Sequence, residues 1–225
     1  EDTEIIINTR GTGKWTGHSL ESLPKLKMIT TCSIGTDMID LDAASRLGIV
    51  VSNQPGRTAP IVAEHIIGLM FAVAKRMAFQ TSELKSGRWT RLDNIFLNGK
   101  TLGLIGTGNV GSEVSRLGNA LGMKVIAWTM HPSVKRAADL GVNFVQLDDL
   151  LKSSDVVSIQ VNLTEDTRGM IGEREFRLMK KGSIFINGGR GNLIDTGSLI
   201  RFLNCGHLAG AGLDVFDQEP LPADH

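Results

Sequence analysis

Short apolar runs alternate with stretches of helical spacing in the first part of the chain. Runs of Ile, Val and Met at 4–8, 25–33 and 49–53 have the length and composition of buried strands. Between the second and third runs, residues 41–48 (LDAASRLG) have helical spacing that ends at Gly48, a common helix terminator. Because strand, helix and strand follow one another, this part predicts parallel strand pairing.

A longer apolar stretch follows and predicts one helix from Ile61 to about Glu83. Its most apolar part, Ile66–Ala74, is too short to cross a bilayer and has charged residues on both sides. We therefore interpret the stretch as a buried helix that connects the first part of the chain with the second. His65, on this helix, is expected to be a packed residue and not a proton donor.

From Thr101 the alternation resumes and becomes more regular. Runs rich in Val and Ile predict strands, and the amphipathic stretches between them predict helices. The predicted strands are TLGLIG, KVIAW, DVVSIQV, SIFIN and LAGAGLDV, and the predicted helices are NVGSEVSRLGNALG, VKRAADLG, LDDLLKSS, EREFRLMKKG and DTGSLIRFLNCG, the last with Asp195 as N-cap. This order predicts an α/β fold with a doubly wound parallel sheet.

Composition narrows the classes of function. Of the 225 residues, 41% are hydrophobic and 21% charged, and Lys+Arg and Asp+Glu balance at 24 each. Without net charge, neither nucleic acid nor a membrane is an expected partner. The two cysteines, Cys32 and Cys205, fit a reducing cytoplasm and are expected to be small buried residues. The acidic opening EDTEIIIN does not have the pattern of a signal peptide.

The stretch GTGNVG carries the clearest chemical signal. Gly106, Gly108 and Gly111 have the spacing of a dinucleotide-binding loop that follows an apolar strand and opens a helix. The first glycine permits a sharp turn, the second permits close approach of a pyrophosphate, and the third permits close packing of helix on strand. The alternative is a glycine-rich turn without a ligand.

Thr129 stands at the end of the next predicted strand, where such loops usually have an acidic partner for the adenosine ribose. A threonine can hydrogen-bond a ribose but does not repel a 2′-phosphate. His131, Lys135 and Arg136 follow and could favour that phosphate. The sequence therefore leaves both NAD and NADP open as the cofactor.

These motifs resemble the D-isomer-specific 2-hydroxyacid dehydrogenases, a family that includes D-lactate, D-glycerate, phosphoglycerate, formate and phosphite dehydrogenases. The resemblance rests on SIGTDMIDLDAASRLGIVVSNQPG, VAEHIIGLM, LGLIGTGNVG, DVVSIQVNLTEDTRGMI, INGGRGNLID and GLDVFDQEPLP. It implies a flavodoxin-like substrate domain, incomplete at both ends here, and a Rossmann cofactor domain with a cleft between them. We expect residues 1–56 to be part of the substrate domain, and residues 57–225, with the long helix, to be the NAD(P)-binding domain.

The resemblance implies a catalytic arginine and glutamate. Arg190, in GGRGN, matches the family's substrate arginine, whose forked donors can grip a carboxylate and a carbonyl. Glu219, in DQEPLP, matches the glutamate that pairs with a catalytic histidine and keeps it protonated. In the family that histidine follows in a later Pro-His segment, and His225 does not match it. We therefore expect the proton donor beyond this sequence, or else a chain that cannot turn over.

Further positions follow from the same resemblance. The backbone of Ser33, Ile34 and Gly35 is expected to meet the substrate carboxylate. The expected cofactor-binding positions are Val62, Gly106, Gly108, Asn109, Val110, Gly111, Thr129, Val161, Asn162, Thr167, Gly188, Gly189 and Asp214. Loop 161–167 is expected to differ in shape, because the family more often has proline at position 162. No metal site is expected.

The leading interpretation is an oxidoreductase that interconverts a small 2-oxo acid and its D-2-hydroxy acid, with the 2-oxo or 2-hydroxy acid as its small-molecule partner. A nucleotide-sensing protein like the corepressors that resemble this family, and a formate- or phosphite-type dehydrogenase, stay open as alternatives. The resemblance also implies a homodimer formed through the cofactor domain and the long helix.

Overall fold

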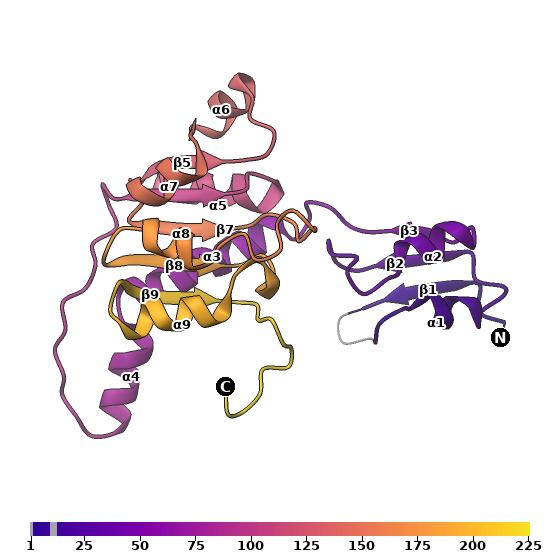
Figure 1. Cartoon of the computed structure of the whole chain (residues 1–225), viewed down its shortest axis with the longest axis horizontal. Helices are drawn as coiled ribbons and strands as arrows, with labels where there is room; N and C mark the ends of the chain where they lie inside the picture. The colour runs from indigo at the N-terminus through magenta and orange to yellow at the C-terminus, as the bar shows by residue number, and fades with distance from the viewer. Residues whose placement is uncertain (1, 10–12) are drawn as a thin grey trace. The chain divides into compact units, whose positions relative to one another are not determined.

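The computed structural model describes residues 2–9 and 13–225. The chain divides into two compact units, Glu1–Ala59 and Pro60–His225 (Figure 1). We call them unit 1 and unit 2. Both are built on parallel sheets, so the predicted α/β class with a parallel sheet is confirmed.

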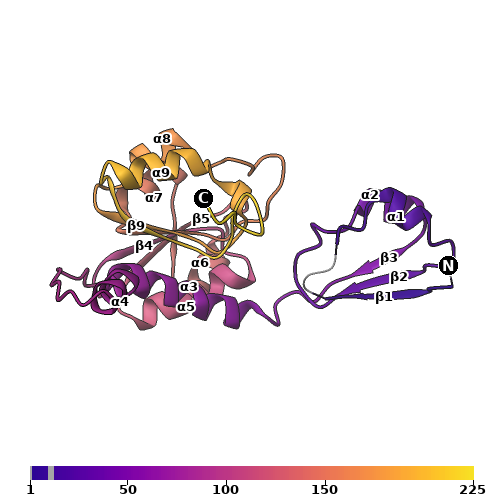
Figure 2. The ribbon, with the colours of Figure 1, turned by 90° about the horizontal axis from the view of Figure 1, so that it is seen from below.

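Unit 1 is a three-stranded parallel sheet, in the order β1-β2-β3, with helices on one face (Figure 2). Its elements are β1 (Ile5–Asn8), α1 (Gly17–Glu21), β2 (Met28–Thr31), α2 (Leu41–Arg46) and β3 (Val50–Ser52). Ile6, Ile29 and Val51 lie in register and pack with residues of the two helices. Gly48 follows α2 with a φ of +71°, as expected for a helix terminator.

The other face of this sheet is apolar and exposed. Ile5, Ile7 and Val50 are 60%, 65% and 61% exposed. Strand alternation places them opposite the buried set, since Ile5 and Val50 are both in register with Met28. Parallel sheets normally have both faces covered, so this exposed face is unusual for such a sheet.

Unit 2 is a six-stranded parallel sheet in the order β6-β5-β4-β7-β8-β9, with helices on both faces. Its elements are α3 (Ala59–Ala74, beginning on the boundary residue), α4 (Met77–Lys85), β4 (Thr101–Ile105), α5 (Asn109–Ala120), β5 (Lys124–Trp128), α6 (Val134–Leu140), β6 (Asn143–Phe144), α7 (Leu147–Ser153), β7 (Val156–Ile159), α8 (Glu173–Leu178), β8 (Ser183–Asn187), the 3₁₀ turn η1 (Gly191–Leu193), α9 (Thr196–Asn204) and β9 (Leu208–Leu213). Numbered from its first strand β4 as 1, the order reads 3-2-1-4-5-6, which is that of dinucleotide-binding folds.

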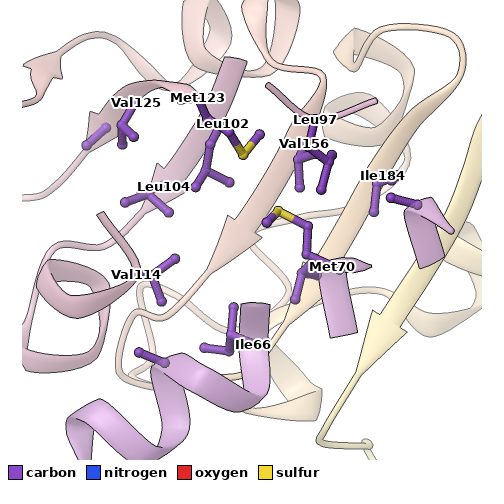
Figure 3. Packing of buried hydrophobic residues seen from close by; sticks show 14 of the residues in the cluster. Ile66, Met70, Leu97, Leu102, Leu104, Val114, Met123, Val125, Val156 and Ile184 are labelled. Carbon is purple, nitrogen blue, oxygen red and sulfur yellow. The ribbon is translucent and has the colours of Figure 1, made fainter. Parts of the chain in front are cut away.

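Two apolar layers hold the sheet of unit 2. On one face, α3 and α5 pack on alternate strand residues such as Leu102 and Leu104 (Figure 3). On the other face, α7, α8 and α9 pack on the intervening residues, including Ile105 and Phe185. The central strands are buried on both sides because their sequence is continuously apolar.

The predicted single helix from Ile61 to about Glu83 is wrong, because α3 and α4 are separate helices. Arg76, between them, has left-handed backbone angles, φ 51° and ψ 35°. The returning chain docks at the break, where the Ile95 amide donates to the Ala74 carbonyl at 2.9 Å. Arg76 Nε also donates to the carbonyl of Asp93 at 3.0 Å. These bonds replace the helical ones that would have continued α3.

Candidate active site

The loops that carry the predicted residues of unit 2 lie at the carboxyl end of its sheet. The strand order reverses between β4 and β7, which pair directly. Open α/β sheets bind ligands at such a reversal, outside the carboxyl ends of the strands. The glycine loop 106–111 follows β4, and Gln160 and Val161 follow β7, so both loops lie at this point.

The glycine loop is too tight for side chains at two positions. Gly106 has a φ of +99°, and a Cβ there would lie 2.8 Å from Val161 Cγ1. A Cβ on Gly111 would lie 2.1 Å from the Gly106 carbonyl oxygen. A Cβ on Gly108 would meet nothing within 4 Å. The first and third glycines are therefore required by packing, whereas the space beside Gly108 is open to a ligand.

Helix α5 begins in this loop, and its first amides point out of the helix. Gly108 is the N-cap and has no side chain to cap them. The first amides of a helix have no partner within it, and the positive end of the helix dipole attracts anions. Two buried polar atoms beside the loop, Thr107 Oγ1 and Gln160 Oε1, make no hydrogen bond within the described structure. The loop thus fits the pyrophosphate of a dinucleotide.

The end of β5 lies directly beside the glycine loop. The Gly106 amide donates to the Trp128 carbonyl at 2.8 Å, and the half-buried Thr129 follows Trp128. Arg136, from α6, donates from its guanidinium to the Thr107 carbonyl. The position that usually recognises the adenosine ribose is therefore occupied by a neutral threonine and has a guanidinium nearby.

Arg190 lies just after the carboxyl end of β8, in a loop that the side chain of Asn187 holds. Asn187 Oδ1 accepts from the Gly189 amide at 3.0 Å, and its Nδ2 donates to the Arg190 carbonyl at 3.0 Å. The Arg190 side chain is half-buried, and its Nη1 donates to the Gly189 carbonyl at 2.9 Å. Asn187 is itself fully buried, so the base of the loop is fixed.

Glu219 belongs to an exposed segment after β9. Its Oε1 accepts from the Phe216 amide at 2.9 Å. The same segment contacts the arginine loop, because a Cβ on Gly191 would lie 1.9 Å from the Phe216 carbonyl carbon. The segments of Arg190 and Glu219 are therefore in direct main-chain contact.

The N-terminal half of α3 crosses the carboxyl ends of β8 and β9. A Cβ on Gly188 would lie 2.6 Å from Ile66, and Val62 lies one helical turn before Ile66. His65 was expected to be packed, but its side chain is 53% exposed, and its Nε2 lies 3.2 Å from Asp214 Oδ1. The Asp214 amide donates to the Asn187 carbonyl at 3.1 Å. Because His65 and Asp214 both face this edge, the pair borders the same site.

Loop 161–167 is held by Thr167 from within. Thr167 is buried, and its hydroxyl donates to the Asn162 carbonyl at 2.7 Å. It also accepts from the Thr164 amide at 2.8 Å. The hydroxyl therefore shapes the loop, and the backbone and Asn162 remain as groups that could face a nucleotide.

Ser33, Ile34 and Gly35 form a bonded loop at the carboxyl ends of β2 and β3 in unit 1. The Gln54 amide donates to the Ser33 carbonyl at 3.1 Å. Asn53 Nδ2 donates to the Ile34 carbonyl at 2.8 Å, and Ser33 Oγ donates to the Gly35 carbonyl at 3.2 Å. The loop carbonyls are thus engaged.

Both cysteines, expected to be buried, are exposed thiols. Cys32 comes one residue after β2, and Cys205 caps the C-terminal end of α9, so neither reaches a core. Within residues 2–9 and 13–225, no group of three or more His, Cys, Asp or Glu side chains could hold a metal ion. In the same residues no helix is long and apolar enough to cross a membrane.

Sequence reasoning missed Asn187, Gly191 and His65 as residues of the site. Asn187 and Gly191 stand inside the motif INGGRGN, yet their roles depend on the buried strand end and on Phe216. The pairing of His65 with Asp214 joins two motifs far apart in the chain. The available sequence signal was that His65 stands in VAEHIIGLM and Asp214 in GLDVFDQEPLP.

Comparison with known proteins agrees with this geometry. Residues 67–225 match the family model described as the NAD binding domain of D-isomer specific 2-hydroxyacid dehydrogenase. The chain is 40% identical to a glyoxylate reductase of Aeropyrum pernix, over 92% of this chain and 64% of that protein. It is 43% identical to a hydroxypyruvate reductase of Thermotoga maritima, over 97% of this chain and 71% of that protein. The solved D-lactate dehydrogenase of Aquifex aeolicus, complexed with NAD and lactic acid, superposes with a TM-score of 0.86 at 37% identity and covers 96% of this chain and 66% of its own.

The chain spans 64% of the length of the Aeropyrum relative. The match nevertheless includes the glycine loop, the Arg190 loop and the Glu219 segment, which unit 2 brings to one edge of its sheet. The family prediction is confirmed: the chain belongs to the D-isomer-specific 2-hydroxyacid dehydrogenases and contains their NAD-binding domain.

Proposed function

We propose that the protein is a dehydrogenase that transfers a hydride between NAD(P)H and the carbonyl carbon of a small 2-oxo acid. The products are the D-2-hydroxy acid and NAD(P)⁺, with one proton taken up by the carbonyl oxygen. One observation carries the proposal: the glycine loop and the Arg190 loop lie at the carboxyl end of one parallel sheet, on either side of β7. That arrangement supports a nucleotide and an anionic substrate at one edge.

Arg190 is the proposed substrate cation. Its guanidinium is half-buried and comes from a loop whose base is tied by Asn187. A planar guanidinium can donate in parallel to a carboxylate oxygen and a ketone oxygen, which aligns the carbonyl and stabilises the negative charge that develops on its oxygen. The backbone of Ser33, Ile34 and Gly35 is a further proposed contact for the substrate carboxylate.

Glu219 is the proposed partner of the proton-donating histidine. A carboxylate beside an imidazole favours the charged form of the ring and so keeps it ready to donate. In this structure Glu219 Oε1 accepts from the Phe216 amide. That bond orients the carboxylate and leaves it exposed to an approaching donor.

The glycine loop leaves open space beside Gly108, which suits a bound cofactor. The amides of Asn109 and Val110, at the start of α5, are the proposed pyrophosphate contacts. The residues proposed to border the nicotinamide are Val62, Gly188, Gly189 and Asp214. Those proposed to border the adenosine half are Thr129, Val161 and Asn162, while the buried Thr167 shapes loop 161–167 from within. When bound, the cofactor supplies the hydride.

The test is reduction of a panel of 2-oxo acids, including glyoxylate, hydroxypyruvate and pyruvate, followed as loss of reduced-nicotinamide absorbance. We expect turnover with at least one of them. Arg190→Gln should lower kcat/KM by about 100-fold or more, because it removes a charge-assisted pair with the substrate. Arg177→Gln is the matched control, since Arg177 is an exposed residue of α8 in an ion pair with Glu173, and kcat/KM should change little.

Other outcomes decide against the proposal. Binding of a nicotinamide nucleotide without turnover of any 2-oxo acid would favour a nucleotide sensor. Oxidation of formate or phosphite in place of 2-oxo acid reduction would favour the formate- or phosphite-type dehydrogenases. If Arg190→Gln and Arg177→Gln lowered kcat/KM equally, Arg190 would not be the residue that binds the substrate.

We also propose an assignment of the two units to the domains of the family. Unit 1 is proposed to be part of the substrate domain, and its exposed apolar sheet face supports a further covering segment. Residues 57–225, which include unit 2, are proposed to be the NAD(P)-binding domain. The cytoplasm is the proposed compartment, since the two exposed thiols suit a reducing environment.

We also propose a homodimer formed through unit 2. The segment of α4 and the chain that follows it exposes large apolar side chains, among them Leu84, Trp89 and Phe96 at 56%, 76% and 71% exposure. A groove along α3, α4 and β9 is lined by Leu69, Val73 and Phe79. Apolar surface of this extent supports an interface.

A further inference from the structure

The turn between β5 and α6, beside the glycine loop, carries no acidic residue. Between Glu113 and Asp139 the chain has no Asp or Glu, while the basic residues Lys135 and Arg136 follow the turn after β5. Both basic residues belong to the first turn of α6. This part of the chain therefore brings positive charge to the edge where the glycine loop lies.

Thr129 is held close to the glycine loop by strand pairing. Trp128 pairs with Ile105, and its carbonyl accepts from the Gly106 amide at 2.8 Å. The next residue, Thr129, therefore leaves β5 beside the first glycine. In dinucleotide-binding folds this position faces the hydroxyls of the adenosine ribose.

Arg136 reaches the same place from α6. Its guanidinium donates to the carbonyl of Thr107, the second residue of the GTGNVG stretch, and its backbone is held because the Ser133 hydroxyl accepts from the Arg136 amide at 3.2 Å. The side chain is half-buried, which limits its rotamers. Because a guanidinium has several N–H donors, one bond to Thr107 leaves others for an anion.

From this arrangement we propose that the protein selects NADP(H) over NAD(H), with Arg136 and Thr129 as the specificity-determining residues. The inference rests on the proposed function, since it names which nucleotide the same site takes. Arg136 would pair with the 2′-phosphate of the adenosine ribose. Thr129 would accept or donate one hydrogen bond at the ribose without repelling that phosphate.

Electrostatics decides the direction of the preference. A carboxylate at position 129 would hydrogen-bond a 2′-hydroxyl but would repel a 2′-phosphate, which carries close to two negative charges near neutral pH. The threonine removes the repulsion and also removes the charge-assisted bond that favours NAD. The exposed Lys135 adds positive potential at the same place.

The experiment is equilibrium binding of NADPH and NADH to the protein by titration calorimetry, at one ionic strength. We expect NADPH to bind at least about tenfold more tightly, which corresponds to one charge-assisted pair. Arg136→Gln should weaken the binding of NADPH by about tenfold and change the affinity for NADH by no more than about twofold. Thr129→Asp should reverse the preference, and it tests the proposal independently if Arg136→Gln perturbs the glycine loop.

Lys152→Gln is the charge-matched control. Lys152 is exposed near the end of α7, close to the amino end of β7 and so at the opposite edge of the sheet. Removal of the Lys152 charge should leave the ratio of the NADPH and NADH affinities unchanged.

Two results overturn the inference while the proposed function stands: NADH binding as tightly as NADPH, or a ratio that neither Arg136→Gln nor Thr129→Asp changes. If neither nucleotide binds, the proposed function itself fails, and the inference fails with it.

Discussion

Gly191 lies directly against the main chain of Phe216, with no room for a side chain between them. A Cβ at position 191 would lie 1.9 Å from the Phe216 carbonyl carbon and 2.0 Å from its oxygen. Because Gly191 follows Arg190 and the Phe216 amide holds Glu219, this contact links the two proposed catalytic segments. The relative placement of Arg190 and Glu219 therefore depends on a glycine that does no chemistry.

Gly191→Ala should separate these segments. The clash is with backbone, which cannot move aside cheaply, so we expect a loss of stability of about 2 kcal/mol or more. Thermal unfolding followed by circular dichroism measures it. Gly197→Ala is the control: its Cβ would make only ordinary contacts at 3.6 and 3.7 Å in the first turn of α9, and stability should stay equal or rise. Equal melting temperatures for the two variants would contradict the packing described here.

Two substitutions in the glycine loop should affect different properties, one the stability of the fold and the other nucleotide binding. Gly111→Ala should destabilise the fold, since its Cβ would lie 2.1 Å from the Gly106 carbonyl oxygen. Gly108→Ala should leave the melting temperature nearly unchanged, because its Cβ meets no protein atom within 4 Å, but should weaken dinucleotide binding by about tenfold or more. Melting curves with and without nucleotide separate the two effects. Unchanged nucleotide affinity in Gly108→Ala would show that the open space beside Gly108 is not used by a ligand.

Asp155 predicts a pH dependence of stability. Burial raises the pKa of its carboxyl, but the hydrogen bonds from the Thr101 amide and Lys180, with the charges of Lys180 and Lys100, outweigh burial and hold the pKa below its usual value. A lowered pKa in the folded state stabilises the fold above the unfolded pKa of about 4, and this contribution is lost as the pH falls through the folded value.

Asp155→Asn should therefore lower the free energy of unfolding by about 1–2 kcal/mol near neutral pH. The difference in free energy of unfolding between the variant and the parent protein should shrink below about pH 4. Urea unfolding across that range measures it. Asp166→Asn, an exposed loop residue, serves as control and should show neither effect. A difference that stays constant down to the lowest pH would mean that the charge of Asp155 does not contribute.

The proposed dimer predicts that Trp89 lies at an interface. Trp89→Ser should shift the protein toward monomer in light scattering after size exclusion, because it removes a large apolar side chain that is 76% exposed in the single chain. Val134→Ser is the control, since Val134 is 90% exposed on α6, away from α4. A parent protein that is monomeric at every concentration tested would exclude this interface.

Periodicity was sufficient for most elements of unit 2. The strands that carry Ile105 and Asn187 have apolar centres, LGLI and IFI. Asp195 caps α9 as its sequence position predicts, with its carboxylate accepting from the Ser198 amide at 2.5 Å. The break at Arg76 could not be predicted, because it depends on the return of Ile95 to the end of α3, a contact between residues distant in sequence. Local pattern also missed α1 and the two-residue strand β6, which are too short to show a period.

For the candidate site, too, local motifs could be predicted from the sequence, whereas contacts between residues distant in sequence could not. Motif spacing indicated Gly106, Gly108 and Gly111, and the resemblance to the family indicated Arg190; both lie at strand ends that the pattern predicts. The bond of Arg136 to Thr107 and the pairing of His65 with Asp214 arise from tertiary packing, so sequence alone could name the residues but not bring them together.

We propose that the amides at the start of α5 bind the pyrophosphate of a nicotinamide dinucleotide. Hydrogen exchange of the protein, followed by mass spectrometry with and without NADPH or NADH, tests it most directly, because it reports on those amides separately from turnover. We predict slower exchange in the segment 107–112 on addition of nucleotide, and a smaller effect in Gly108→Ala. Exchange in this segment that is unchanged at saturating concentrations of both nucleotides would contradict the account.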